Sequence, residues 1–439
     1  MIKISFIISV AIVAIGFATT PRSALAQDSK TDSNKVTAGQ CDQLLEKSVI
    51  DFYMPNSIDN KNLGFHEAID ETGKFVPGNK FLVLQARQTW FFSHLAVNQT
   101  EPKYRMHAGA AAELGYFGLQ KHFRDKDRGG YILITDSEGK AVDDRKHVYP
   151  MCFVIYALVE MHRITDSPQP LDDAMKLFRE IEKHCYDKEH GGYQELFANN
   201  WKLIDDPEQW GVVSTAGIKT YNSHLHIMEA FTELYRETKD ELVGKRLEEL
   251  IAINTKTVRH PEFPCNIDGW TPNWKMIDTP KNLRASYGHD LECIWLVLEA
   301  NDALGRSSDL YKDWAVAMCD HAIKYGHDKQ HGGFFSGGPL GKPADDRTKV
   351  WWVQSEAMVG LLTMEKLTGD AKYRDLFEKT YRFVEKHHVS RDGGWWANLN
   401  EDGSVGESKM KASMWKGAYH DGRALMRCAK LLRELEEAK

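Results

Sequence analysis

The sequence predicts an all-α protein, an (α/α)6 barrel of about 12 helices with short β-hairpin-like loops at one end. Three observations lead to this prediction: a recurring glycine–glycine–aromatic marker, a spacing of about 60–70 residues between markers, and amphipathic helical patterns in the intervals. A repeat of this length holds one helical hairpin and its connection. Six such repeats without a polar capping repeat favour a closed barrel over an open solenoid.

The marker defines the repeats along the chain. It occurs at Gly129–Tyr131, Gly191–Tyr193, Gly332–Phe334 and Gly393–Trp395. A weaker copy begins at Leu63, and the double gap after Gly192 predicts a degenerate copy around Pro264–Trp270. Residues 143–149 also resemble residues 345–351, at an offset of about three repeats.

Twelve amphipathic stretches account for the helices. Their apolar residues recur at spacings of three and four, which is typical of a helix with one buried face. In chain order they are residues 41–54, 79–97, 103–123, 148–165, 170–186, 217–238, 240–258, 288–304, 308–325, 350–368, 371–388 and 410–436. No domain boundary is visible after Cys41, so we expect residues 41–439 to form a single domain.

The N-terminal 26 residues are typical of a secretory signal peptide. Lys3 supplies the charge, residues 4–18 the apolar segment, and residues 24–26 a small-x-small cleavage site. The apolar segment is shorter than the roughly 20 residues that a spanning helix needs. We therefore expect an exported protein, periplasmic or extracellular, with no membrane attachment after cleavage. The polar residues 27–40 are expected to form a disordered leader.

Charge and motifs narrow the possible partners. The net charge is −7, and loss of Lys3 and Arg22 with the signal peptide makes it −9, which argues against nucleic acid or an anionic membrane as partner. The seven cysteines show no CxxC spacing, and the sequence has no HExxH motif, phosphate-binding loop or dinucleotide-binding glycine motif. We therefore expect no metal and no cofactor.

The strongest candidate for chemistry is the segment Tyr287–Trp295, where a glycine turn opens a helix. His289, Glu292 and Trp295 follow at i, i+3 and i+6 and lie near one helix face. The imidazole can carry a proton, the carboxylate can orient it, and the indole can stack on a sugar ring. A helix N-terminus lowers the pKa of a histidine and a carboxylate raises it, so we expect the pKa of His289 to be near neutral. A purely structural histidine is the alternative.

Two other helices carry similar sets. Asn222 and His226 share a face at i, i+4, whereas His224 points away from His226, so one ion cannot bind both histidines. On the last helix, His420 lies close to Trp415 in the sequence, in a segment too polar for packing alone.

Charged residues in otherwise apolar helices add further candidates. Arg87 is one, and a buried arginine needs an anionic or oxygen-rich partner, either a structural carboxylate or negative charge that develops on a substrate. Trp352 and Glu356 share a face at i, i+4 and can stack on a sugar ring and bind its hydroxyls. The alternative for Glu356 is an ion pair with Arg87 or another arginine of the barrel.

At these residues the chain resembles the N-acylglucosamine 2-epimerase superfamily, and within it the cellobiose 2-epimerases. The resemblance covers about residues 45–435 and rests on Gln85–Arg87, Asn222–His226, Gly288–Glu292, Trp351–Glu356 and Trp415–His420. It implies an (α/α)6 barrel and reversible epimerisation at C2 of a reducing-end glucose without a cofactor. The sequence departs from the usual family pattern at Ser223, at Leu291 and in its signal peptide.

The resemblance also implies roles for the candidate residues. His289 and His420 would be the acid/base pair, with Glu292 supporting His289. The other predicted site residues would surround the reacting end of the sugar or hold its rings; they are Arg87, Tyr149, Asn222, His226, Trp295, Trp352, Glu356 and Trp415.

This chemistry suits the residues themselves. A proton on a carbon next to a carbonyl is removed by a base once the enediolate is stabilised, and its return to the opposite face needs a second acid. An aldose–ketose isomerase, which returns the proton to C1, remains an alternative. A glycosidase or lyase using Glu292 and Glu356, and a non-catalytic sugar-binding protein, are further alternatives. The expected partner is a monosaccharide or oligosaccharide, and the expected state is a monomer or weak homodimer.

Overall fold

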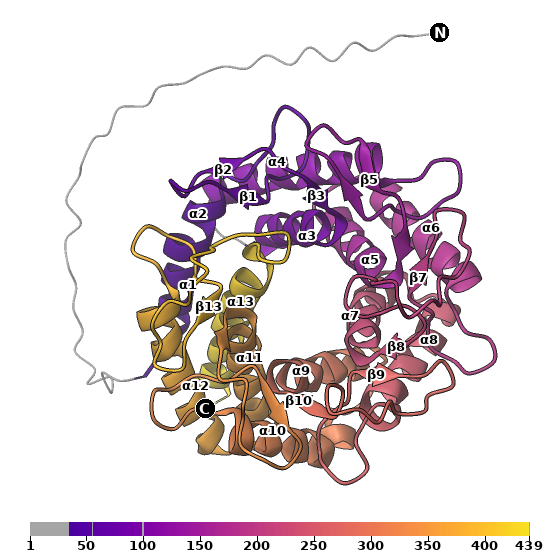
Figure 1. The fold of residues 1–439 in the computed structure, drawn as a ribbon. Coiled ribbons are helices and arrows are strands. Elements are labelled where there is room, and N and C mark those ends of the chain that lie inside the picture. The colour runs from indigo at the N-terminus through magenta and orange to yellow at the C-terminus, as the bar shows by residue number, and fades with distance from the viewer. Residues whose placement is uncertain (1–34, 55, 99–100, 439) are drawn as a thin grey trace, which may run out of the picture. The chain divides into compact units, whose positions relative to one another are not determined.

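The computed structural model describes residues 35–54, 56–98 and 101–438, which form a ring of helices (Figure 1). Residues from Val36 onward make up one compact unit. The predicted signal peptide and residues 27–34 of the predicted leader lie outside the described residues.

Two concentric rings of helices form the barrel (Figure 1). The inner ring consists of α3 (Leu82–Asn98), α5 (Val148–His162), α7 (Tyr221–Thr238), α9 (Tyr287–Ala303), α11 (Trp351–Thr368) and α13 (Ala418–Glu437). The outer ring consists of α1 (Ala38–Leu45), α4 (Pro102–Gly118), α6 (Gln169–His184), α8 (Glu241–Ala252), α10 (Lys312–Gly326) and α12 (Ala371–Phe383). Each inner helix contacts the next, and α13 contacts α3. The ring therefore closes, and the predicted (α/α)6 barrel is confirmed.

Short helical segments extend the outer ring. They are η1 (Glu46–Ile50), α2 (Asp51–Tyr53), η2 (Leu119–Phe123), η3 (Ile253–Thr257), η4 (Ser308–Tyr311) and η5 (Val384–His388).

Burial distinguishes the two rings. In α5 every residue from Val148 to Met161 is buried, because neighbouring helices surround it on all sides. In α6 only one stripe is buried, consisting of Pro170, Ala174, Leu177, Phe178 and Ile181. The inner helices are thus mostly buried, so a polar residue in the buried part of one of them needs a partner there.

Two predicted boundaries were wrong. The leader was expected to run to Gln40, but α1 begins at Ala38, because Thr37 and Gln40 form a capping box that fixes the first turn. Val36 is buried as well, and its N–H donates to Glu378 Oε2 at 2.7 Å. The last helix begins at Ala418 rather than residue 410, because the preceding residues run alongside the neighbouring loop, where Ala397 donates to the Met410 carbonyl.

Six small antiparallel sheets lie at one end of the barrel. Their strands are β1 (Ala68–Ile69), β2 (Phe75–Val76), β3 (Lys80–Phe81), β4 (Ile134–Thr135), β5 (Ala141–Asp143), β6 (Lys146–His147), β7 (Leu196–Phe197), β8 (Lys219–Thr220), β9 (Gly269–Trp270), β10 (Arg284–Ser286), β11 (Gly337–Pro339), β12 (Lys349–Val350) and β13 (Asn398–Leu399). The pairings are β1–β2, β3–β4–β5, β6–β7, β8–β9, β10–β11 and β12–β13. Strands β3, β6, β8, β10 and β12 each run directly into an inner helix, so the sheets mark the end where the inner helices begin.

The glycine markers form tight hairpins before the inner helices. Their glycines have positive φ, for example +76° at Gly129 and +72° at Gly130, which favours glycine over other residues. The aromatic residue that follows closes a β-bridge, as in Arg124 with Tyr131. The predicted degenerate copy is confirmed by the equivalent bridge between Arg259 and Asn266.

A buried lysine clamps four of these hairpins to the inner helix that follows. The lysine lies two residues before the helix, and its Nζ contacts a hairpin aspartate in the pairs Lys80–Asp59 (2.8 Å), Lys146–Asp125 (2.8 Å), Lys219–Asp187 (2.7 Å) and Lys349–Asp328 (2.7 Å). In the last pair Nζ also donates to the Gly332 carbonyl at 2.7 Å. Each clamp fixes the start of an inner helix.

No helix in the described part of the chain is long and apolar enough to cross a membrane.

Lys349→Met should lower the free energy of unfolding by about 3–5 kcal/mol, because it leaves the buried carboxylate of Asp328 without its cation. Urea unfolding monitored by tryptophan fluorescence measures this change. The matched control is Lys372→Met, whose lysine is 45% exposed and pairs with Asp320 on the surface, for which we expect less than about 1 kcal/mol. Equal effects of the two substitutions would contradict a role for the buried clamp.

Candidate active site

The predicted site residues gather where the inner helices begin. All six inner helices contribute, and most of the side chains come from the first two turns of each helix. The contributions are Arg87 from α3, Tyr149 from α5, Asn222 and His226 from α7, His289 and Glu292 from α9, Trp352 and Glu356 from α11, and His420 from α13. Residues more than 300 positions apart in the sequence therefore meet at one end of the barrel.

His289 is half-buried in the first turn of α9. Its Nδ1 lies 3.0 Å from Ser286 Oγ, and its ring lies 4.6 Å from the Trp352 ring. A Cβ on Gly288 would come within 2.5 Å of Trp352, so only glycine allows this approach. Glu292 was predicted to support His289, but the hydrogen bond to His289 comes from Ser286, and Glu292 accepts from Arg423 instead.

His420 is almost fully buried on the facing helix. Its Nδ1 lies 2.7 Å from Glu356 Oε1, and its ring lies 6.0 Å from the Trp352 ring. Trp352 thus contacts both imidazoles. The two histidines reach the same indole from different helices, each with Nδ1 engaged by a neighbour, which leaves Nε2 as the nitrogen that can exchange a proton.

Glu356 and Trp295 do not face a sugar, which corrects two predicted roles. Glu356 is fully buried, with Oε1 on His420 and Oε2 accepting from Trp295 Nε1 at 3.0 Å. The alternative, a pair with an arginine of the barrel, is the one that the structure supports. Trp295 is only 2% exposed and lies beneath the guanidinium groups of Arg423 and Arg427. It belongs to the barrel core below the histidines.

Arg423 binds three buried carboxylates from three different helices, and it was not among the predicted site residues. Its Nη2 lies 2.7 Å from Glu292 and 2.8 Å from Glu356, and its Nη1 contacts Glu229. Arg423 itself is 1% exposed. A sequence signal existed, since Arg423 follows His420 by three residues within a buried helix, but its partners could not be identified from that spacing.

The three carboxylates do not share one protonation state. Arg423 and the neighbouring histidines lower the pKa of Glu229 and of Glu356 to about 2, against the opposing effect of burial. Burial and the nearby charge of Glu356 raise the pKa of Glu292 well above its usual value. The raised pKa of Glu292 favours its neutral form, whereas Glu229 and Glu356 stay ionised beside Arg423.

Burial also governs the histidines. It lowers the pKa of His289 and of His420 to about 3, and the positive charge of Arg87 adds to the effect. The expectation that His289 would have a near-neutral pKa was wrong, because desolvation outweighs the neighbouring carboxylates. At neutral pH both imidazoles are uncharged and are available as bases.

Arg87 keeps its positive charge without a carboxylate partner among the described residues. Its Nη2 donates to the Tyr149 hydroxyl at 3.0 Å, and its guanidinium lies over the rings of Phe153 and Tyr419 at 4.2 and 4.9 Å. Such a cation, held by aromatic rings and 4% exposed, is well suited to bind developing negative charge.

The remaining predicted residues complete the wall and the mouth of the site. His226 is 2% exposed, and its Nδ1 lies 2.8 Å from Glu229 Oε2. Asn222 Oδ1 has no hydrogen-bond partner in the described part of the chain. Trp415 is half-buried, with its ring edge against Phe81 at 5.2 Å. A cavity of about 850 Å³ lies near Trp415, bordered by Phe81, Ile134, Trp396, Met410 and Met414, and none of the predicted site residues lines it.

Comparison with known proteins places this arrangement in a family. The family model of N-acylglucosamine 2-epimerase matches residues 64–424. The chain belongs to the N-acylglucosamine 2-epimerase family. It is 30% identical over 398 residues to a cellobiose 2-epimerase of Bacteroides fragilis, covering 89% of this chain and 97% of the relative. It is 32% identical over 384 residues to a cellobiose 2-epimerase of Ruminococcus albus, covering 84% and 92%.

A solved structure agrees. The cellobiose 2-epimerase of Spirochaeta thermophila superposes with a TM-score of 0.82 at 28% identity, covering 91% of this chain and 97% of that one. The chain is therefore a carbohydrate epimerase, an isomerase that acts on a saccharide.

Two groups in the site of this epimerase have ligand atoms close enough for a metal ion. They are His226, His289 and Glu292, and Glu292, Glu356 and His420, each with ligand atoms within 4.8 Å of one another. Arg423 already pairs with Glu292 and Glu356, and the raised pKa of Glu292 favours its neutral form. A divalent ion would therefore have to compete with the guanidinium of Arg423 for these two residues.

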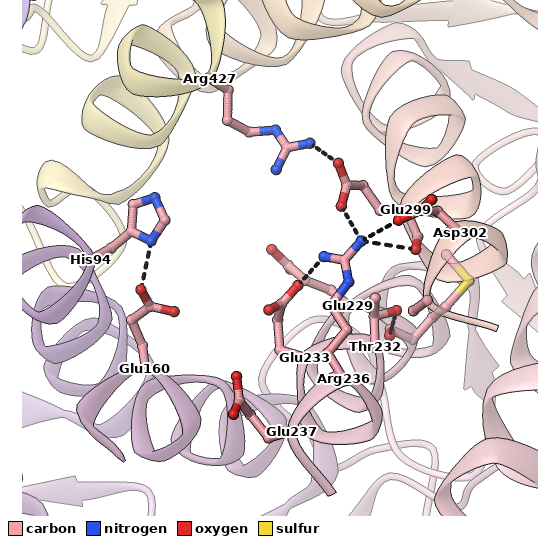
Figure 2. Close-up of polar contacts among 12 residues, drawn as sticks. His94, Glu160, Glu229, Thr232, Glu233, Arg236, Glu237, Glu299, Asp302 and Arg427 are labelled. Atoms are coloured by element: carbon pink, nitrogen blue, oxygen red, sulfur yellow. Dashed lines mark hydrogen bonds and ion pairs between the residues drawn. The ribbon is translucent and has the colours of Figure 1, made fainter. Parts of the chain in front are cut away.

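The opposite end of the epimerase barrel has a second cavity of about 740 Å³, where the inner helices end. Figure 2 shows its lining of paired charges: Arg236 lies between Glu233 and Glu299, and Glu299 also binds Arg427. The Arg236–Glu233 and Arg236–Glu299 distances are both 2.6 Å. These side chains neutralise one another and tie α7, α9 and α13 together, which is a structural role.

Glu356→Gln should destabilise the epimerase by about 1.5–3 kcal/mol, since it removes an ionised acceptor of three hydrogen bonds from His420, Arg423 and Trp295. Glu292→Gln should cost less than about 1 kcal/mol, because the carboxyl it replaces is already neutral. The two residues are equally buried and share Arg423, so each is a control for the other. Urea unfolding at pH 7 measures both, and a larger loss for Glu292→Gln would contradict the assigned protonation states.

Proposed function

We propose that this epimerase interconverts glucose and mannose at the reducing end of a β-linked disaccharide such as cellobiose. The reaction removes the C2 proton of the open-chain sugar and returns it to the opposite face through an enediolate. The observation that carries the proposal is the placement of His289 and His420 against one indole, Trp352, from two different helices. The similarity to enzymes named cellobiose 2-epimerase supports the choice of sugar.

Each direction of the reaction needs one imidazole that takes the C2 proton and a second imidazole that gives a proton to the opposite face. Burial lowers the pKa of each imidazole and keeps both neutral in the free enzyme, so the second imidazole takes its proton from solvent before it donates. The negative charge of the enediolate raises the pKa of the imidazoles beside it and favours this uptake. Glu356 accepts from His420 Nδ1 and stabilises its imidazolium form, whereas the partner of His289 is the uncharged Ser286 hydroxyl. Each imidazole is therefore the base in one direction and the acid in the other, and His420 is the one whose protonated form has a carboxylate partner.

The enediolate needs positive charge and hydrogen-bond donors near O1 and O2. Arg87 supplies a cation with no ion-pair partner among the described side chains, and the Tyr149 hydroxyl orients it. His226 and Asn222, whose Oδ1 has no partner in the described structure, line the same wall. Burial and the charge of Glu356 raise the pKa of Glu292, which favours its protonated form, so its unpaired Oε2 adds a possible donor.

Aromatic side chains provide the surface for the sugar rings. Trp352 and Trp415 are half-buried at the mouth, in contrast to the buried Trp295. An indole face against the apolar face of a sugar excludes water and positions C2 between the imidazoles. The cavity of about 850 Å³ near Trp415 is not lined by any of the predicted site residues, so the choice of a disaccharide rests on the similarity to enzymes named cellobiose 2-epimerase.

Incubation in deuterated water tests the proposal directly. With cellobiose, lactose, mannobiose, glucose and mannose as substrates, the enzyme should form the C2 epimer and place deuterium at C2. A ketose product with deuterium at C1 would instead identify an aldose–ketose isomerase, and cleavage of the glycosidic bond would identify a glycosidase.

His289→Ala and His420→Ala should each reduce net epimerisation by about 10²–10⁴-fold, since a positioned acid–base group contributes that much. One variant should still exchange the C2 proton of a single epimer with solvent, and the other variant that of the opposite epimer, because the remaining base acts on one face only. His107→Ala, on the exposed surface of α4, is the control and should keep full activity. Near-normal turnover by either folded variant would exclude the two-base mechanism.

We also propose that the enzyme acts as a monomer or weak homodimer, because one chain supplies the whole site. We propose further that it is exported, periplasmic or extracellular, as the pattern of residues 1–26 suggests. N-terminal sequencing of the exported protein should then begin at Gln27. A chain that retains Met1 would contradict the cleavage.

A further inference from the structure

The hairpin before α9, residues 259–266, differs from the other five at the positions that hold a hairpin together. The second glycine of the marker, which has positive φ in Gly64, Gly130, Gly192, Gly333 and Gly394, is replaced by Cys265. The clamping lysine, two residues before the helix, is replaced by Ala285. The aspartate of the clamp is replaced by His260; the hairpin before α13 also lacks it, with Ser390 at this position, but there Lys416 is kept and pairs with Asp421. This hairpin therefore has neither charge of the clamp.

The outer helix that faces this hairpin is changed as well. In two other repeats a glutamate of the outer helix accepts from the N–H of the second glycine: Glu180 from Gly130 at 2.8 Å, and Glu249 from Gly192 at 2.9 Å. Here α10 places His321 beside Cys265 instead. The inner helix contributes Asp290, whose Oδ1 accepts from the N–H of Asn266 at 3.1 Å and is thereby held in position.

Cys265, Asp290 and His321 form a buried cluster. Their Sγ, carboxylate and imidazole atoms lie within 4.8 Å of one another. The three residues are 0%, 0% and 6% exposed. Asp290 Oδ2 and both ring nitrogens of His321 have no hydrogen-bond partner in the described part of the chain. Buried polar atoms without partners are costly, so an unpaired carboxylate oxygen and an unpaired imidazole close to a buried thiol indicate a ligand that the three residues bind together.

We propose that Cys265, Asp290 and His321 bind a divalent cation of the zinc type between the hairpin, α9 and α10. A thiolate, a carboxylate oxygen and an imidazole nitrogen are the donors that zinc takes in tetrahedral sites, and water can complete the fourth position. The proton of the thiol and any proton on the carboxyl are released when the metal binds, and the thiolate and carboxylate remain as its ligands. The slight exposure of His321 gives the ion a way in from the outer ring.

The ion would serve the same purpose as the missing lysine. In the other clamps an ammonium group joins an anionic hairpin residue to the start of an inner helix. Here the cation joins Cys265 of the hairpin to Asp290 in the first turn of α9 and also to α10, which lies beside α9 (Figure 1). Asp290 directly follows His289, so the ion would steady the helix start that carries one of the two imidazoles. This role is structural and separate from proton transfer.

Metal binding to the full chain tests the proposal. The purified protein, first depleted of metal with a chelator, is dialysed against zinc, and the bound metal is counted by mass spectrometry. Cobalt is then used as a spectroscopic probe, since a thiolate ligand gives a sulfur-to-cobalt charge-transfer absorption. We expect one equivalent of zinc per chain, the charge-transfer absorption with cobalt, and a melting temperature that rises on addition of zinc.

Cys265→Ala and His321→Gln should each lose the bound equivalent, the cobalt absorption and the rise in melting temperature. The matched control is Cys185→Ala, which removes another fully buried thiol distant from the cluster and should keep all three signals. His321→Gln preserves the size of the side chain near the surface, so it gives a result even if the core variant does not fold. Absence of stoichiometric zinc in the wild type, or zinc that both variants retain, as expected for a site at His226, His289 and Glu292, would overturn the assignment.

Discussion

The structure of the site depends on one buried guanidinium. Arg423 is the only cation among the described residues that pairs with Glu229, Glu292 and Glu356. These carboxylates come from α7, α9 and α11, so the last helix of the chain both closes the ring against α3 and holds three other inner helices at one height. Because Glu229 and Glu356 in turn contact His226 and His420, the position of Arg423 determines how two imidazoles are presented. Desolvating such a network is costly, and it is tolerated because nearly every charge has a partner.

The two ends of the barrel differ in charge. The N-termini of six inner helices converge on the histidines, and each contributes a partial positive charge there. These partial charges and Arg87 therefore create a positive field at this end of the barrel, which favours a bound anion. At the other end, the helix C-termini meet a network of arginines and glutamates that neutralise one another (Figure 2). The direction of the inner helices thus decides which end can stabilise an anion.

The sequence predicted the helical repeats well, because each repeat needs particular residues that are close together in the chain. Two glycines with positive φ, an aromatic residue and an amphipathic pair of helices recur at a fixed spacing, and each is visible without knowledge of the fold. The site was predicted less completely. Trp295 shares a helix face with His289, but six residues rise by about 9 Å along a helix, so its indole lies in the core below the site. Spacing within a helix also could not show that Glu356 bonds His420 across two helices.

The hydrogen-bond partners of the imidazoles explain why the spacing of residues along α9 predicted the wrong partner for His289. Glu292 lies one turn from His289, but Arg423 offers it a charged donor at 2.7 Å, which is a stronger interaction than a neutral imidazole provides. His289 therefore takes the hydroxyl of Ser286, the last residue before α9. Ser286 follows Ala285, where the other inner helices are preceded by a lysine. His420 holds the same place in its helix as His289, and it follows a lysine, Lys416, whose ammonium group pairs with Asp421 inside α13. The two imidazoles therefore differ mainly in their Nδ1 partners, which are the carboxylate of Glu356 for His420 and the hydroxyl of Ser286 for His289.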